Sequence, residues 1–396
     1  MYVRHAFLAL LFVTAGACTG ESVKPLPTPP AAPAADTARD FDALLERYFE
    51  ELLELNPLLA TYIGDNRYND RLPNFLGSEY RRQAREFNER YLAQARRFDP
   101  AELNAPRRIS HEIFLRERKR AIEAERFPDH LLPINQAGSL LTVMPALGSG
   151  TNAQPFATVE DYDHWLKRLD GYVVWMYQAI ANMREGMAKG VVQPRPVMEK
   201  VLPQVEAMIV AKPGDSTFFA PVQKFPETFS AADRARLTEA YTVAIRDELV
   251  PAFRRLHDFI RDEYLPHARG TVAWTALPDG EAWYAYFVQE HTTTTMSADE
   301  IHRLGLSEVA RILGEMDRVK DAVGFQGDRA AFFTYLETDP KFYFTNGADL
   351  LEGYRVLKRR IDAALPRLFS VFPKADYEVR EVEPYRAQAA AGAYYQ

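Results

Sequence analysis

The sequence predicts a mainly α-helical globular protein, on three observations. Apolar residues recur every three or four positions from about Asp40 to Phe372, the period of amphipathic helices. Ser or Thr precedes several of these runs, where such residues cap helix N-termini. Apolar residues make up 47% and charged residues 26% of the 396 residues, a composition that excludes a wholly disordered chain or a collagen-like repeat.

The first half of the chain predicts four helices. An apolar stripe over residues 41–55 forms the first one, which Asn56-Pro57 ends. A basic helix with a thinner apolar face is expected over 80–98, and a third helix over 109–127. The fourth is long: Thr158 and Asp161 form a pair like a capping box in front of a helix that runs to about Lys189.

The second half predicts four more helices. Ser230 begins one that extends to about Ile260, and Pro251 inside it is expected to kink it. Ser297 and Glu300 make a full capping box for the next. The last two are expected over residues 329–337 and 348–372.

The other segments are irregular. Proline and glycine mark long loops over residues 128–154 and 212–229. Residues 377–382 (Tyr-Glu-Val-Arg-Glu-Val) give the best strand pattern and predict a short β element near the C-terminus. We find no repeat with the period of a helical solenoid.

The N-terminus predicts a bacterial signal peptide over residues 1–17. A short basic start precedes an apolar run over 6–17, which is too short for a membrane span of about 20 residues. The run ends Ala15-Gly16-Ala17-Cys18, which fits two kinds of processing: lipidation of Cys18, or ordinary cleavage after Ala-x-Ala. We favour lipidation, because the only cysteine of the chain stands where that modification requires it.

Residues 18–37 are expected to form a Pro/Ala-rich tether between the lipid and a domain that covers 38–396. Five prolines in this segment favour extended polyproline II and prevent a packed core. The expected partner of Cys18 is therefore a membrane. Thr19, rather than Asp, predicts attachment to the outer membrane, facing the periplasm.

Charge and motifs exclude several function classes. The net charge of −7 gives no electrostatic case for nucleic acid binding. One cysteine allows neither an internal disulfide nor a Cys-based zinc site. The chain has no P-loop, no Rossmann glycine motif and no Gly-x-Ser-x-Gly elbow. No histidine has another four residues away, and His111-Glu112 lacks the second histidine of the zinc motif.

Several short sequence segments, taken in order, resemble the bacterial domain-of-unknown-function family 885 (DUF885), which is similar to zinc metallopeptidases of the Taq-carboxypeptidase kind. They are distributed over nearly the whole predicted mature chain. The segments are residues 56–65, 183–190 with Pro194-Arg195, 250–253, 264–269, Thr292-Thr293 with 300–306, 324–327 and 365–369.

The resemblance implies a long-helix, gluzincin-type metallopeptidase-like domain that is truncated here. The family's His-Glu-x-x-Pro-Gly-His-His helix lies downstream of an aromatic stretch that residues 392–395 resemble, and this sequence stops at Gln396. We therefore predict no catalytic or metal-binding residue and no cofactor in this chain. Zinc is expected for the full-length family.

The family layout implies that the remaining helices form the wall of a substrate cleft for a peptide. The residues expected there are Thr292, Thr293, His302, Tyr394 and Tyr395. For the threonines the alternative is a lead-in to the Ser297 cap, and for the two tyrosines it is an ordinary core position.

Three functions remain open from the sequence. The first is the N-terminal part of a metallopeptidase-like lipoprotein, inactive alone. The second is a periplasmic binding or structural lipoprotein. The third is one half of a split peptidase, whose partner would be the missing C-terminal half.

Overall fold

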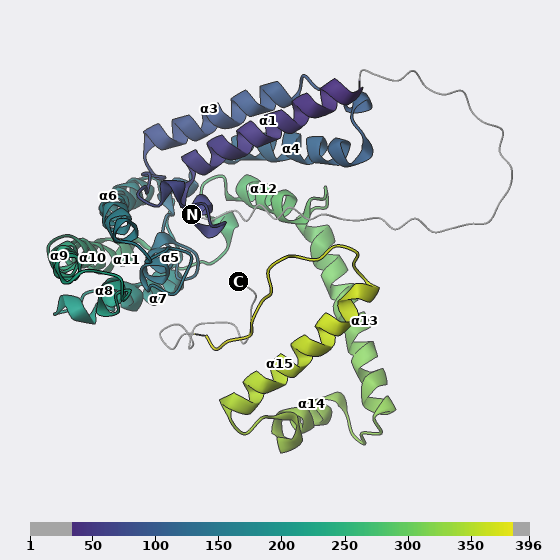
Figure 1. The fold of residues 1–396 in the computed structure, drawn as a ribbon. Coiled ribbons are helices and arrows are strands. Elements are labelled where there is room, and N and C mark those ends of the chain that lie inside the picture. Colours follow the sequence, from purple (N-terminus) through teal and green to yellow (C-terminus); the bar gives the residue numbers. More distant parts are fainter. Residues whose placement is uncertain (1–33, 383–396) are drawn as a thin grey trace. The chain divides into compact units, whose positions relative to one another are not determined.

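The computed structural model describes residues 34–382 (Figure 1). The chain divides into two compact units: unit 1 ends at Met296, and unit 2 begins at Ser297, a boundary that the sequence does not predict. Helices dominate both units, and no β-strand occurs among the described residues, so the predicted mainly α class is confirmed. The first helix begins inside the segment predicted as a tether, and the predicted signal peptide lies outside the described residues.

Three long helices lie side by side in unit 1: α1 (Ala34–Leu55), α3 (Ser78–Ala95) and α4 (Ala105–Ala124). They share an apolar cluster that contains Phe41 and Leu44 of the predicted stripe, both buried. The ring of Tyr48 packs edge-on against Tyr91 and Phe114, with centroids 5.1 and 4.8 Å away. Edge-to-face aromatic pairs of this kind add about 0.5–1.5 kcal/mol beyond the burial of their area.

The first helix ends at the predicted position. Asn56 is the N-cap of α2 (Pro57–Tyr62), and its side-chain oxygen accepts the backbone N–H of Leu59 at 3.4 Å. Pro57 occupies the first turn of α2, where the N–H group that proline lacks would have no helical partner. The dipeptide thus closes one helix and starts the next.

The longest helix of unit 1, α6 (Val159–Lys189), forms the centre of the main apolar core. Its predicted cap is confirmed: Thr158 Oγ1 accepts the N–H of Asp161 at 3.2 Å, and the Asp161 carboxylate accepts the N–H of Thr158 at 2.8 Å. Trp165 and Trp175 are fully buried along its length. The helices α7 (Arg195–Glu206), α9 (Ala231–Val243) and α10 (Val250–Asp258) supply the other side of this core.

Arg168 of α6 connects segments that are distant in the sequence. Its guanidinium is completely buried and donates to Thr61 Oγ1 at 2.9 Å and to Gln154 Oε1 at 2.6 Å. It also donates to the backbone carbonyls of Tyr68 at 2.8 Å and Arg71 at 3.1 Å. All four acceptors are neutral, and burial lowers the pKa of Arg168 to about 10.

The helix predicted from Ser230 contains two wide turns instead of a simple kink at Pro251. A π-helical segment, Ala244–Leu249, joins α9 to α10, and a second one, Phe259–Tyr264, leads into α11 (Leu265–His267). A proline follows each segment after one residue. Proline cannot donate to the helix ladder and its ring clashes with a carbonyl four residues back, so a wider turn before it relieves both problems.

The spacing of the apolar residues explains these wide turns. Buried side chains recur at steps of four through both segments: Leu237, Tyr241, Ile245, Leu249 and Phe253 at the first, and Leu256, Ile260 and Tyr264 at the second. A regular α-helix advances about 400° in four residues, so such a stripe would drift by roughly 40° at each step and leave the core. A π turn holds more residues and removes this drift. The whole stripe therefore stays buried.

Some helices have no signal in the sequence. The helices α5 (Leu140–Gly148) and α8 (Ala220–Gln223) lie within the two predicted loops. Most residues of α5 are themselves buried and apolar. Its sequence therefore shows no alternation of an apolar and a polar face from which a helix could be predicted. The helix α12 (Gly280–Thr292) is also unpredicted, and its Trp283 stacks on Phe127 at 5.5 Å between centroids.

Unit 2 contains α13 (Ala298–Ala322), α14 (Arg329–Thr338) and α15 (Gly347–Ala364). The predicted Ser297–Glu300 capping box is present, with N–H to side-chain distances of 2.8 and 3.3 Å. The last helix ends eight residues before its predicted end at 372, because Pro366 cannot continue it. Residues 377–382 are irregular, which corrects the predicted β element: no neighbouring strand of the described chain pairs with them.

Candidate functional site

The residues predicted to line a substrate cleft are distributed over the chain. Thr292 and Thr293 stand at the end of α12 in unit 1, whereas His302 is exposed in the second turn of α13 in unit 2. Cys18, Tyr394 and Tyr395 lie outside the described residues. The described part of the chain therefore does not assemble these residues within one unit.

The threonine run makes local hydrogen bonds. Thr292 Oγ1 donates to the Val288 carbonyl at 2.8 Å and lies 3.0 Å from Thr294 Oγ1. Thr293 has a φ of 59°, a left-handed conformation that is unusual for a β-branched residue. Its N–H donates to the Gln289 carbonyl and closes α12. These contacts end one helix shortly before the Ser297 cap starts the next.

The histidines of the described residues do not form a metal site. One ring nitrogen each of His111, His267 and His291 lies 2.7–3.0 Å from a backbone carbonyl. His130 Nδ1 lies 3.2 Å from an Arg81 guanidinium nitrogen, and burial, followed by this charge, lowers the pKa of His130. Residues 34–382 contain no group of three His, Cys, Asp or Glu that could hold a metal. The zinc implied by the family resemblance thus fits no described site.

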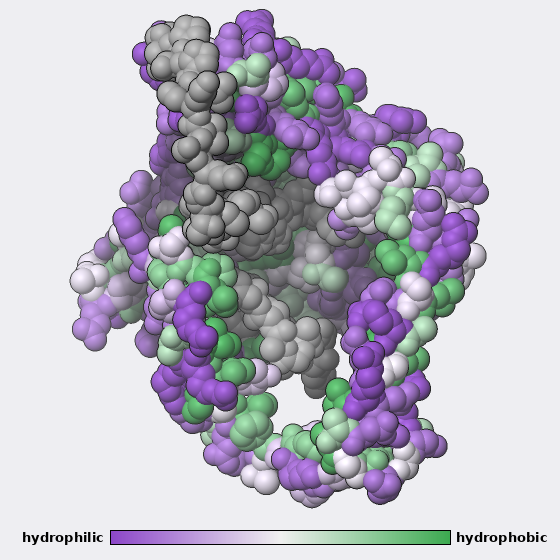
Figure 2. Space-filling view, turned by 90° about the vertical axis from the view of Figure 1, so that its right-hand side faces the viewer, coloured by the Kyte–Doolittle hydropathy of each residue, from purple (hydrophilic) through white to green (hydrophobic). Residues whose placement is uncertain are grey.

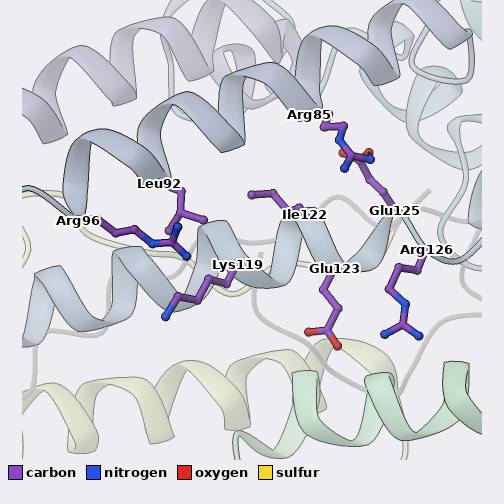
Figure 3. Close-up of a pocket in the computed structure, with 8 residues that line it drawn as sticks. All are labelled: Arg85, Leu92, Arg96, Lys119, Ile122, Glu123, Glu125 and Arg126. Carbon is purple, nitrogen blue, oxygen red and sulfur yellow. Dashed lines mark hydrogen bonds and ion pairs between the residues drawn. The ribbon is translucent and has the colours of Figure 1, made fainter.

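A groove of about 500 Å³ lies between α3 and α4 in unit 1 (Figure 3). Figure 3 shows that both helices contribute charged side chains to it, around an apolar floor of Leu92 and Ile122. The charged lining residues are Arg85, Arg96, Lys119, Glu123, Glu125 and Arg126.

The two carboxylates of this groove are already paired. Arg85 contacts Glu125 at 3.3 Å, and Glu123 contacts Arg120 at 3.0 Å. Partial burial raises the pKa of Glu125 above its ordinary value. The basic side chains of the lining therefore outnumber its acidic ones, and both carboxylates already have an arginine partner. Sequence reasoning identified the basic helix but missed the groove, because Lys119 and Glu125 reach it from the neighbouring helix.

The helices of unit 2 leave apolar rows exposed. On α13 the row Val309, Ile312, Met316, Val319 and Val323 is 38–64% exposed, and we call it the α13 seam. On α15 the row Leu350, Tyr354, Leu357 and Ile361 is 42–46% exposed, and we call it the α15 seam. Figure 2 shows apolar side chains at the surface of this unit, in the lower part of the view.

Unit 2 has almost no core of its own. Of residues 297–382, Phe332 alone is buried. The charges beside the α13 seam are paired within the helix, since Arg311 contacts Glu308 at 2.7 Å and Glu315 at 2.9 Å. Contiguous exposed apolar surface is rare on a protein that acts alone and marks a site of interaction. The two seams are thus the candidate functional surface.

None of the helices within residues 34–382 has both the length and the apolar character needed to cross a membrane. This finding holds for α6 and α13, the longest helices of the two units.

Comparison with known proteins identifies related chains. A family model described as "Bacterial protein of unknown function (DUF885)" matches residues 57–396. The crystal structure of "the putative lipoprotein from Colwellia psychrerythraea" shares the fold with a TM-score of 0.77 at 16% sequence identity. The match covers 90% of this chain and 64% of that one, so this chain spans less than two thirds of the Colwellia protein. No curated protein matches the chain.

Proposed function

This chain belongs to the bacterial family of unknown function DUF885, and on that basis we propose that it is a lipid-anchored envelope protein that presents a helical scaffold for polypeptide. The anchor is Cys18, and the tether after it leads to α1. The observation that carries the proposal is the run Ala15-Gly16-Ala17-Cys18 behind an apolar segment. The Colwellia protein, described as a putative lipoprotein, supports it through the shared fold.

The scaffold role is supported by unit 2. The α13 and α15 seams are exposed apolar surfaces that a further polypeptide can cover. They therefore favour a scaffold that binds such a polypeptide, rather than a self-contained binding protein. A complete metallopeptidase-like protein, formed by one chain or by two separate chains, is consistent with the family resemblance. We assign no hydrolytic step to this chain, because zinc hydrolysis needs converging ligands and a general base.

The anchor is tested by labelling cells with a radioactive or clickable fatty acid. The full chain, expressed with residues 1–17, should carry the label and sediment with the outer membrane. Cys18→Ala should lose the label completely, because the thiol is the acceptor. Ser22→Ala, a neighbouring change in the tether, should keep it.

A further variant tests the location. Thr19→Asp should keep the lipid and move the protein from the outer to the inner membrane fraction. An unlabelled wild-type protein, cut after Ala17 and free of the membrane, would contradict the proposal.

A further inference from the structure

The groove between α3 and α4 contains more positive charge than the described chain neutralises. We propose that this groove binds the phosphate headgroups of anionic phospholipids in the membrane to which Cys18 is attached. The inference deepens the proposed envelope role and rests on it for the source of the lipid. All the residues that carry it belong to unit 1.

Three of the basic side chains in the groove have no acidic partner. Both carboxylates of the lining are occupied by arginines, as described above. Arg96, Lys119 and Arg126 are exposed, and no Asp or Glu within residues 34–382 forms an ion pair with them. Arg126 lies over the ring of Phe127 at 5.7 Å, a contact that leaves its charge in place. The groove therefore offers three cations to an external anion.

The arrangement of these cations fits a lipid phosphate. Figure 3 shows Arg96, which follows α3, and Lys119 of α4 at one end of the groove, and Arg126 at the other end. Guanidinium and ammonium groups both donate charge-assisted hydrogen bonds to phosphate oxygens. The apolar floor of Leu92 and Ile122 suits the glycerol and acyl carbons beside a lipid phosphate better than it suits a fully hydrated free anion.

Charge is distributed unequally over the helices of this part of unit 1. The helix α1 has seven acidic and two basic residues, whereas residues 78–126, which include α3 and α4, have thirteen basic and nine acidic residues. The apolar cluster that α1 shares with them contains Phe87, Tyr91 and Phe114, which do not line the groove. An anionic surface therefore attracts the α3–α4 hairpin and repels α1, although the whole chain has a net charge of −7.

The start of α1 lies at the same end of the bundle as Arg96. The rings of Phe41, in the second turn of α1, and Phe98, just beyond α3, are 5.3 Å apart between centroids. The chain between Cys18 and α1 spans at most roughly 50–60 Å at full extension. A lipid on Cys18 thus keeps the groove close to the membrane, and this high effective concentration makes a weak headgroup contact sufficient.

Co-sedimentation with lipid vesicles tests the groove without the anchor. Residues 19–396, produced without the signal peptide, contain no cysteine and hence no site for the lipid. Binding to phosphatidylcholine vesicles with about 30% phosphatidylglycerol should be at least about tenfold stronger than to phosphatidylcholine alone, because only the former are anionic. It should weaken as salt is added.

Charge reversal assigns the binding to the groove. Arg96→Glu combined with Lys119→Glu should weaken binding to the anionic vesicles at least about tenfold. Lys200→Glu combined with Arg254→Glu is the matched control: both side chains are exposed, neither forms an ion pair within residues 34–382, and the change in net charge is the same. The control should weaken binding less than about twofold. Arg96→Lys with Lys119→Arg keeps both charges and should keep the binding.

A fluorescent probe tests the same contact in a chain whose Arg96 and Lys119 are intact. Since residues 19–396 have no cysteine, Arg126→Cys and Lys200→Cys each create a single attachment point for an environment-sensitive fluorophore. Anionic vesicles should shift its emission to the blue at position 126 and leave it unchanged at position 200.

Several results would overturn the inference. They are equal binding to neutral and anionic vesicles, no binding to either, an equal loss in the two charge-reversed variants, and a probe at position 126 that responds to an acidic peptide but not to vesicles. Fatty-acid labelling of cells reports the anchor separately. Labelled cells with unbound vesicles would refute the groove alone, whereas bound vesicles with unlabelled protein would refute the anchor alone.

Discussion

At the residue scale, Arg168 is a buried cation held by neutral acceptors. The guanidinium lies in the core, where an unpaired charge is costly, and its four hydrogen bonds offset that cost. Thr61 and Gln154, two of these partners, precede it in the sequence by 107 and 14 residues. No local pattern reveals such a contact, so the sequence could not predict it.

We expect Arg168→Ala to lower the free energy of unfolding by about 3 kcal/mol, because buried acceptors lose their donors. The measurement is urea denaturation followed by the fluorescence of the buried Trp165 and Trp175. Lys167→Ala is the control: its side chain is 61% exposed and reaches Asp70 only at 4.0 Å, so its effect should stay within about 0.5 kcal/mol. Equal stability of both variants would contradict the role given to Arg168.

At the scale of elements, α6 depends on a close approach at Gly171. A Cβ atom there would lie 2.5 Å from the Leu72 carbonyl oxygen, which belongs to backbone and cannot swing away. At Gly314 of α13 a Cβ atom would meet nothing within 4 Å. The two glycines occupy similar helical positions but have different neighbours.

This contrast predicts opposite effects of one substitution. Gly171→Ala should destabilise the protein by about 1–3 kcal/mol through overpacking. Gly314→Ala should stabilise α13 by about 0.5–1 kcal/mol, because alanine loses less backbone entropy in a helix. Both are measured by thermal unfolding monitored by circular dichroism. A stabilising Gly171→Ala would show that Leu72 moves aside freely.

The sequence predicts elements well where the signal is local. The caps at Thr158 and Ser297 are confirmed in type and position, since each depends on residues three apart. The end of α15 differs from the prediction, because the apolar pattern continues past Pro366, and α5 has no amphipathic pattern, because it is apolar on most sides.

At the scale of the whole molecule, the sequence predicts the mainly α class and the family, but not the boundary after Met296. The sequence predicts an amphipathic α13, yet the exposure of its apolar stripe depends on which other segments are present. A pattern in the sequence cannot tell a face that is buried within a chain from one that is buried by a partner. The candidate seams were therefore visible only in the structure.

Metal binding is also a property of the whole molecule. We expect the purified chain to bind less than one equivalent of tightly held zinc, because within residues 34–382 no three His, Cys, Asp or Glu side chains converge. Elemental analysis after dialysis measures this, together with hydrolysis of a mixed peptide library, where no cleavage is expected. One equivalent of zinc that resists dialysis, or peptide cleavage lost on chelation, would contradict the prediction.

The two wide turns in the helix from Ala231 to His267 have a consequence for how related proteins can vary in length. Each accommodates an extra residue without turning the flanking faces away from α6. An insertion in the middle of α10 would instead rotate everything after it by about 100°. Gaps of one residue between relatives should therefore fall at 244–249 or 259–264, which makes these turns the points where evolution can lengthen or shorten this helix without repacking the interior.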